Sequence, residues 1–157
     1  MNLQDKLIIK ELIPLPIDIQ TAKNILLANN FDDFIVTFED NEYKIKLKVS
    51  YGTIQFSSPS LNQGIYIKLN FFYESDKLFL SLKTPFRFEY LLICVGFLFT
   101  LFVMFKSQQH LEISKIITIV AIFIITFLWF RLFIQSQEKE LIQKVKNVFK
   151  QKTSSFY

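Results

Sequence analysis

The sequence predicts a membrane-anchored α+β protein. We expect an N-terminal antiparallel β-meander with one packing helix, then a two-helix transmembrane hairpin and a C-terminal amphipathic helix. Three observations lead to this fold class. Residues 42–49 alternate strictly between apolar and charged side chains, two apolar runs without Asp, Glu, Lys, Arg or His cover 90–105 and 116–130, and charge divides the chain near Pro85. Apolar runs of this kind are typical of membrane spans, because a bilayer core of ~30 Å takes about 20 helical residues to cross.

The chain begins with one strand and one helix. Residues 7–15 favour a strand that Pro14 and Pro16 close, because proline cannot donate a hydrogen bond to a neighbouring strand. Asp18 can cap a helix over 19–28, since its carboxylate accepts hydrogen bonds from the first turn. The apolar stripe of that helix predicts that it lies on an apolar surface; its members are Ile19, Ala22, Ile25 and Leu26.

That surface should be an antiparallel sheet. Side chains of period two predict strands over 34–39, 42–49, 53–57, 65–73 and 78–82, joined by short turns. In the second of these strands Tyr43, Ile45, Leu47 and Val49 point one way, and the intervening lysines point the other way. One face of the meander is therefore expected to be buried and the other wet.

The membrane part follows with almost no linker. Thr84 and Pro85 are a favourable helix start, with Thr84 as the N-cap and proline at the first helical position. The predicted organisation is a head, a first span, an external loop, a second span and a basic tail, at residues 1–84, 85–106, 107–115, 116–134 and 135–157.

Orientation follows from basic residues near the span ends. Seven lysines and arginines flank the outer ends of the hairpin, whereas its loop contains only Lys106 and Lys115. The first residues also lack the apolar region of a signal peptide. We therefore expect an integral membrane protein with two spans and both termini in the cytoplasm.

The tail is predicted to be a basic amphipathic helix. Its apolar stripe comprises Leu141, Ile142, Val145, Val148 and Phe149, with lysines roughly opposite. A helix of this kind beside a membrane favours contact with anionic lipid. The predicted membrane-surface residues are Arg131, Lys139, Lys144, Lys146 and Lys150. Gly96 and Thr100 have the spacing of a helix-packing pair, either within the hairpin or with another copy.

No catalytic, metal or cofactor site is predicted, and we expect no enzyme. The only histidine, His110, has no cysteine or second histidine near it, and three glycines cannot form a phosphate loop. The acids around residues 32–42 lack the spacing of a calcium loop, and exposed turn acids explain them better. No cofactor is expected.

Two features of the head leave alternatives open. Lys44, Lys46 and Lys48 form a basic strip that could meet acidic lipid or a phosphate, but a wet sheet face protected by lysine explains them more simply. Residues 1–84 carry nine lysines against ten acids, and this net charge of −1 argues against nucleic acid.

These observations support two functional hypotheses. The first is a membrane-anchored interaction or sensory module, whose head contacts a protein, a lipid or a small ligand. The alternative is an accessory subunit of a larger transport or envelope complex, which binds through its transmembrane hairpin. Both hypotheses imply a protein partner or a homo-oligomer in addition to the lipid bilayer.

Overall fold

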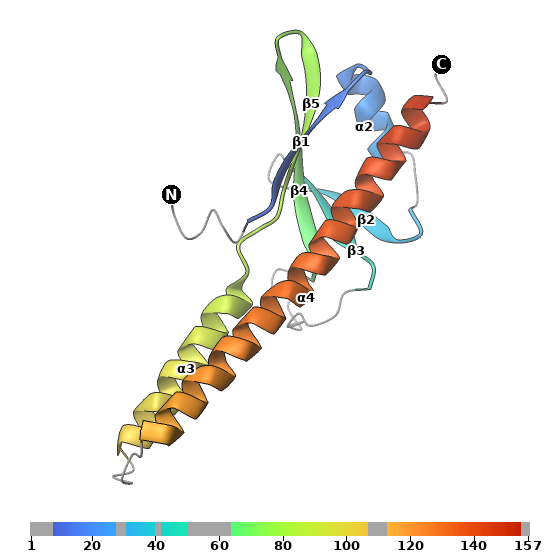
Figure 1. The fold of residues 1–157 in the computed structure, drawn as a ribbon. Helices are drawn as coiled ribbons and strands as arrows, with labels where there is room; N and C mark the ends of the chain where they lie inside the picture. The colour runs from blue at the N-terminus through green and yellow to red at the C-terminus, as the bar shows by residue number, and fades with distance from the viewer. Residues whose placement is uncertain (1–7, 28–30, 40–41, 50–63, 107–112, 155–157) are drawn as a thin grey trace. The chain divides into compact units, whose positions relative to one another are not determined.

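The computed structural model describes residues 8–27, 31–39, 42–49, 64–106 and 113–154 (Figure 1). The strands are β1 (Lys10–Leu15), β2 (Phe34–Glu39), β3 (Glu42–Leu47), β4 (Tyr66–Glu74) and β5 (Lys77–Lys83). The helices are α2 (Ile19–Leu27), α3 (Phe88–Lys106) and α4 (Ile113–Ser154). The α+β class and the two long apolar helices are therefore confirmed.

The five strands form one antiparallel sheet in the order β1-β5-β4-β3-β2. Strands β2 to β5 form a meander, and β1 pairs with β5 at the far edge. The predicted strand at 53–57 lies outside the described residues, and β3 pairs directly with β4. Within the described sheet, the meander therefore has no strand between these two.

The alternation predicted for this region is confirmed over most of its length. Tyr43, Ile45 and Leu47 are buried, and each pairs with an apolar neighbour on β2 or β4. Val49 lies beyond the end of β3 and is exposed, so its predicted inward orientation is wrong. One face of the sheet is the core, and the other face carries most of the polar side chains.

Helix α2 begins at the predicted cap. The Asp18 carboxylate accepts hydrogen bonds from the Thr21 amide at 2.9 Å and from the Thr21 hydroxyl at 2.6 Å. These bonds, from the side chain first, lower the pKa of Asp18. Ala22, Ile25 and Leu26 are buried, as the predicted stripe requires.

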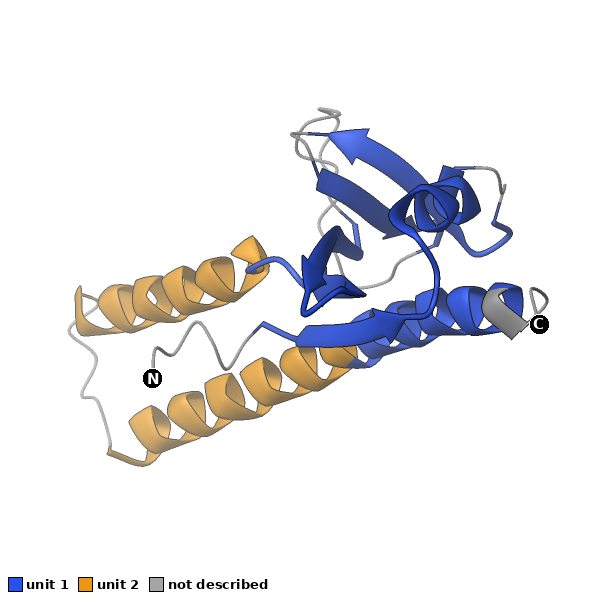
Figure 2. Ribbon diagram, turned by 90° about the horizontal axis from the view of Figure 1, so that it is seen from above, with its two compact units in different colours: residues 1–86, 136–157 blue, residues 87–135 orange. Residues whose placement is uncertain are grey.

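Two compact units make up the chain, and they are coloured in Figure 2. We call residues 1–86 with 136–157 the head unit and residues 87–135 the hairpin unit. Helix α4 is continuous in the chain and belongs to both units, because its residues from Ser136 onward are assigned to the head unit. The predicted second span and tail are therefore one helix.

The junction before α3 differs from the predicted helix start. The Thr84 hydroxyl accepts a hydrogen bond from the Ile9 amide at 2.9 Å, and the Thr84 amide donates to the Ile9 carbonyl at 3.0 Å. Thr84 therefore extends the pairing of β5 with the chain before β1, and it is not the N-cap of α3. The helix begins at Phe88 instead of at Pro85.

The β4–β5 turn holds two residues in the left-handed region. Ser75 has φ of 50° and Asp76 has φ of 62°. A two-residue hairpin loop with both φ values positive favours Asn-Gly, because an L-residue there costs about 1–2 kcal/mol.

We therefore expect the double change Ser75→Asn and Asp76→Gly to raise the free energy of unfolding by about 1 kcal/mol. Denaturant unfolding of the detergent-solubilised protein measures this change. The reverse test is Asp76→Val, whose β-branched side chain should destabilise the turn. Equal stability of all three proteins would contradict the assigned turn conformation.

Candidate functional site

The apolar core of the head unit includes the segment of α4 that follows the hairpin. Four side chains of this segment are at most 2% exposed, namely Leu141, Ile142, Val145 and Phe149. The Phe149 ring meets the Phe71 ring of β4 edge-on, with centroids 6.4 Å apart. Chain segments on both sides of the hairpin therefore build one core.

Ion pairs join this segment of α4 to β1 and to the residues before β2. The Lys146 ammonium lies 2.5 Å from the carboxylate of Glu11 on β1. Lys144 lies 2.9 Å from Glu140 and 3.4 Å from Asp33. The hydrogen bond with Glu140 is the main cause of the raised pKa of Lys144, to which Asp33 also contributes.

These pairs are partly exposed, so each contributes little to stability. They flank the buried apolar stripe, which determines the face of α4 that meets the sheet.

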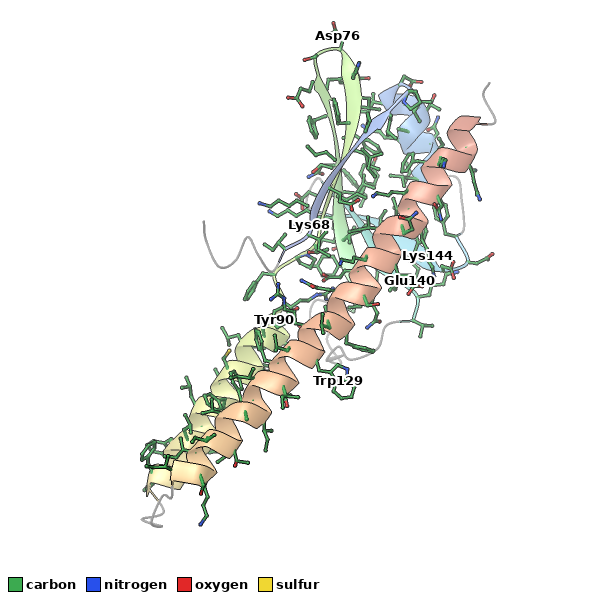
Figure 3. The ribbon with its side chains drawn as sticks, in the orientation of Figure 1. Lys68, Asp76, Tyr90, Trp129, Glu140 and Lys144 are labelled. Atoms are coloured by element: carbon green, nitrogen blue, oxygen red, sulfur yellow. The ribbon has the colours of Figure 1, made fainter. Side chains whose placement is uncertain are left out.

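A cavity of about 310 Å³ opens beside this ion-pair group within the head unit. It is bordered by α4, the end of β3 and the residues before β2; the lining residues are Asp32, Asp33, Leu47, Lys48, Val49, Gln137, Glu140 and Lys144. Figure 3 labels Glu140 and Lys144 on α4. The lining carries three carboxylates and two ammonium groups, a composition suited to a small polar ligand or to the polar side chains of a partner.

The predicted cluster of acids does not converge. Asp32 and Asp33 line the cavity, whereas Glu39 pairs with Lys44 and Glu42 pairs with Lys68, each at 2.6 Å. Asp40 lies outside the described residues. Among the residues that the structure describes, no three His, Cys, Asp or Glu side chains gather where they could hold a metal ion.

The predicted membrane-surface residues have different surroundings. Lys144 and Lys146 make ion pairs within the head unit, Lys139 and Lys150 are exposed on α4, and Arg131 belongs to the hairpin unit. The apolar stripe expected to enter lipid is buried in protein instead. Lipid contact by these basic residues therefore stays a prediction, without the support of that stripe.

The hairpin unit packs through aromatic side chains. The Phe97 and Phe123 rings stack with centroids 4.1 Å apart, and Tyr90 meets the rings of Phe127 and Phe130. Figure 3 labels Tyr90 on α3 and Trp129 on α4. These aromatic contacts join α3 to α4 along the unit.

The predicted helix-packing pair, Gly96 and Thr100, is not among these aromatic contacts. The Thr100 hydroxyl donates to the Gly96 carbonyl at 2.9 Å within α3. A Cβ atom added to Gly96 would meet nothing within 4 Å. The hairpin therefore does not pack on itself at Gly96, and contact with another copy stays a prediction.

Most of the outer surface of the hairpin unit is apolar. Both helices are long and apolar enough to cross a membrane, by length and composition. Large exposed side chains include Trp129 at 70% and Phe99 at 65%. A continuous exposed apolar surface indicates contact with lipid or with another protein. Together with the length of the two helices, it supports membrane association. The predicted external loop at 107–115, which contains His110, lies mostly outside the described residues, and α4 begins within it at Ile113.

Sequence reasoning missed Glu11 as a partner of α4 and Glu138 as a buried carboxylate, which is only 2% exposed. No local pattern indicates either role, because both depend on which surface α4 covers.

No family model, characterised protein or solved structure matches this chain.

Proposed function

We propose that this protein is a membrane-anchored interaction or sensory module. The hairpin unit spans the bilayer, both termini lie in the cytoplasm, and the head unit binds a partner there without catalytic chemistry of its own. The single observation that carries this proposal is that residues 1–86 and 136–157 form one compact unit, with the hairpin between them in sequence.

This connectivity suits a sensor or an anchor. Both chain connections of the hairpin enter the same folded unit, one through Thr84 and the other within α4. A displacement of the apolar helices must therefore act on the core of the head at two points. The ion pairs of Lys144 and Lys146 and the neighbouring cavity lie on the segment of α4 that would receive it.

The alternative is an accessory subunit that binds its complex through the hairpin. The observation that favours it is an apolar groove of about 250 Å³ on the hairpin unit, lined by Thr126, Trp129, Phe130 and Phe133. A helix of another membrane protein could occupy such a groove.

A variant that contains the head unit without the hairpin distinguishes the two proposed functions. Residues 87–135 are replaced by a flexible Gly/Ser linker, so that both segments of the head unit remain in one soluble chain. If this variant without the hairpin captures the same partner from solubilised membranes as the full chain does, the module function is supported. Capture by the full chain alone would favour the accessory subunit.

Topology gives an independent prediction. In a Cys94→Ser background, a cysteine at position 108 should react with an impermeant maleimide added from outside the cell, while a cysteine at Lys152 should react only after the membrane is opened. Basic flanks resist translocation, which is why the outer ends of the hairpin should stay inside. Reaction of position 108 from the cytoplasmic side alone would refute the proposed orientation.

A further inference from the structure

Strand β2 lies at one edge of the sheet, and one side of its backbone is turned away from the other strands. The Lys48 amide donates to the Asp33 carbonyl at 3.0 Å, so these two residues form a hydrogen-bonded pair. Hydrogen-bonded pairs alternate with non-hydrogen-bonded pairs along an antiparallel ladder. Every second residue of β2 therefore points its N–H and C=O groups away from β3, namely Phe34, Val36 and Phe38.

A second hydrogen bond agrees with this assignment. Leu47 pairs with Phe34, and its amide donates at 3.0 Å to the Ile65 carbonyl, on the side of β4. Leu47 and Phe34 are therefore a non-hydrogen-bonded pair. In the part of the chain that the structure describes, no strand or loop forms backbone hydrogen bonds with the outer side of β2. We call Phe34, Val36 and Phe38 the β2 edge.

The β2 edge also leaves an apolar side chain uncovered. All three of its side chains lie on the core face, because each pairs with a buried residue of β3. Phe34 is 3% exposed, whereas Phe38 is 57% exposed although its ring meets that of Tyr43, with centroids 4.8 Å apart. A side chain on the core face of an edge strand has a cross-strand neighbour on one side only. The apolar core face thus continues to the end of β2 and is open to solvent there.

The two edges of the sheet differ. On β1, the Thr84 amide donates to the Ile9 carbonyl, so by the same alternation Lys10, Leu12 and Pro14 face outward. Proline has no amide hydrogen, and proline or lysine on an edge strand hinders its pairing with other chains. Strand β2 has the sequence FIVTFE, with neither residue. The β2 edge therefore lacks the protection that β1 has.

A second copy of β2 complements the β2 edge. When two β2 strands run antiparallel with Val36 opposite Val36 of the other copy, Phe34 lies opposite Phe38 in both directions. Each of these pairs then exchanges two N–H···O=C hydrogen bonds. Every side chain of the β2 edge also meets an apolar side chain on the same face. The arrangement has two-fold symmetry, which is the commonest symmetry of homodimers.

Charges at the ends of this pairing are balanced within each chain. The symmetric register places Asp33 of one copy opposite Glu39 of the other. Asp33 lies 3.4 Å from Lys144, and Glu39 lies 2.6 Å from Lys44. Each acid therefore has a lysine of its own chain beside it, which reduces the repulsion between the two acids.

We propose that the β2 edge pairs with the same edge of a second copy, so that two head units form one continuous antiparallel sheet. The pairing uses only strands of the head unit, so it does not depend on the proposed membrane anchoring. An unprotected edge rich in β-branched and aromatic residues pairs readily with another strand. The strand that matches its hydrogen-bonding groups and its apolar face is β2 itself.

Cysteine cross-linking of the detergent-solubilised full chain tests the register. In a Cys94→Ser background, Val36→Cys should form an intermolecular disulfide under mild oxidation, because the two Cα atoms would be ~5.5 Å apart. Phe38→Cys is the matched control on the same strand and the same face. Its copy would lie four residues further along the paired strand, about 13 Å away. It should therefore form little disulfide, although Phe38 is the more exposed of the two residues.

Proline variants test the hydrogen bonds. Val36→Pro removes both central amide donors of the dimer, whereas the bonds of β2 to β3 come from the neighbouring residues. We expect the dimer dissociation constant, measured by sedimentation in detergent, to rise about 30-fold, at roughly fivefold per hydrogen bond. Leu12→Pro is the matched control on the outward side of β1 and should change the constant by less than about twofold.

A second variant keeps the test valid if Val36→Pro does not fold. Phe38→Lys changes an exposed side chain and no backbone group, and it places a lysine on the edge, where lysine opposes pairing. It should also weaken the dimer, while circular dichroism of the protein stays unchanged.

Three results would each overturn the inference: a monomer at every concentration, equal disulfide yields at positions 36 and 38, or equal effects of Val36→Pro and Leu12→Pro. Hydrogen exchange of the Val36 amide identifies a different occupant. Protection that does not depend on protein concentration would assign the β2 edge to a segment of the same chain, and would also overturn the inference. A monomer that still captures a partner through the head unit would leave the proposed module function standing.

Discussion

Replacing Phe149 by alanine is expected to destabilise the head unit by about 3–5 kcal/mol, because it deletes a fully buried ring and leaves a cavity. Phe149 is 2% exposed and contacts Phe71 on β4, which precedes it by almost half of the chain. A loss of this size is a large part of the 5–15 kcal/mol typical of a folded domain.

The measurement is hydrogen exchange of the β4 and β5 amides in the detergent-solubilised full chain. Protection of these amides should fall in Phe149→Ala, although the substitution lies far from them in sequence. The control is Lys150→Ala on the exposed side of the same helix turn, with an expected change within about 0.5 kcal/mol. Unchanged protection in Phe149→Ala would show that the segment of α4 does not complete the core.

Replacing Ile45 by aspartate is expected to unfold the head unit. Ile45 has no exposed surface and lies in the middle of the sheet, opposite Val36 on β2 and Ile67 on β4. A carboxylate there would be buried without a partner, which costs several kcal/mol.

The neighbouring change Lys46→Asp tests the register of β3. Lys46 points to the open face, so its replacement should keep the sheet folded, with an effect limited to surface charge. Circular dichroism and protease resistance of both variants in detergent give the comparison. A folded Ile45→Asp protein with an unfolded Lys46→Asp protein would invert the assigned faces of the sheet.

Local patterns in the sequence predict much of this fold. Alternation at Tyr43, Ile45 and Leu47 indicates both the strand and its buried face, because side chains of a strand have period two. Asp18 indicates the start of α2, since its cap bonds involve only the next turn. Apolar composition alone indicates the two long helices.

Long-range pairing is what the sequence does not reveal. The stripe of Leu141, Val145 and Phe149 shows that α4 covers something apolar, but a bilayer and a sheet produce the same stripe. Thr84 has the chemistry of a helix cap, and its hydrogen bonds with Ile9 arise only because β1 returns to pair with β5.

The candidate site depends on long-range contacts in the same way. Asp33 and Lys144 lie far apart in the sequence, and they line one cavity only because α4 packs on the sheet of the head unit. Such packing is set by non-local contacts, which a single sequence does not record. The candidate site is therefore the part least accessible to sequence reasoning.

The part of α4 that follows the hairpin unit completes the core of the head unit, and cross-linking of the full chain in membranes tests this packing most directly. In a Cys94→Ser background, Glu11→Cys with Lys146→Cys should be joined in high yield by a short bis-maleimide, since the native side chains form a 2.5 Å ion pair. Glu11→Cys with Lys139→Cys is the matched control, because Lys139 is exposed and two turns away along α4. Efficient cross-linking of position 11 to 146 and little to 139 is the predicted result. Equally poor cross-linking of both pairs, together with quenching of a fluorophore attached at position 146 by a nitroxide on the lipid, would contradict this packing and place this part of α4 on the bilayer instead of the sheet.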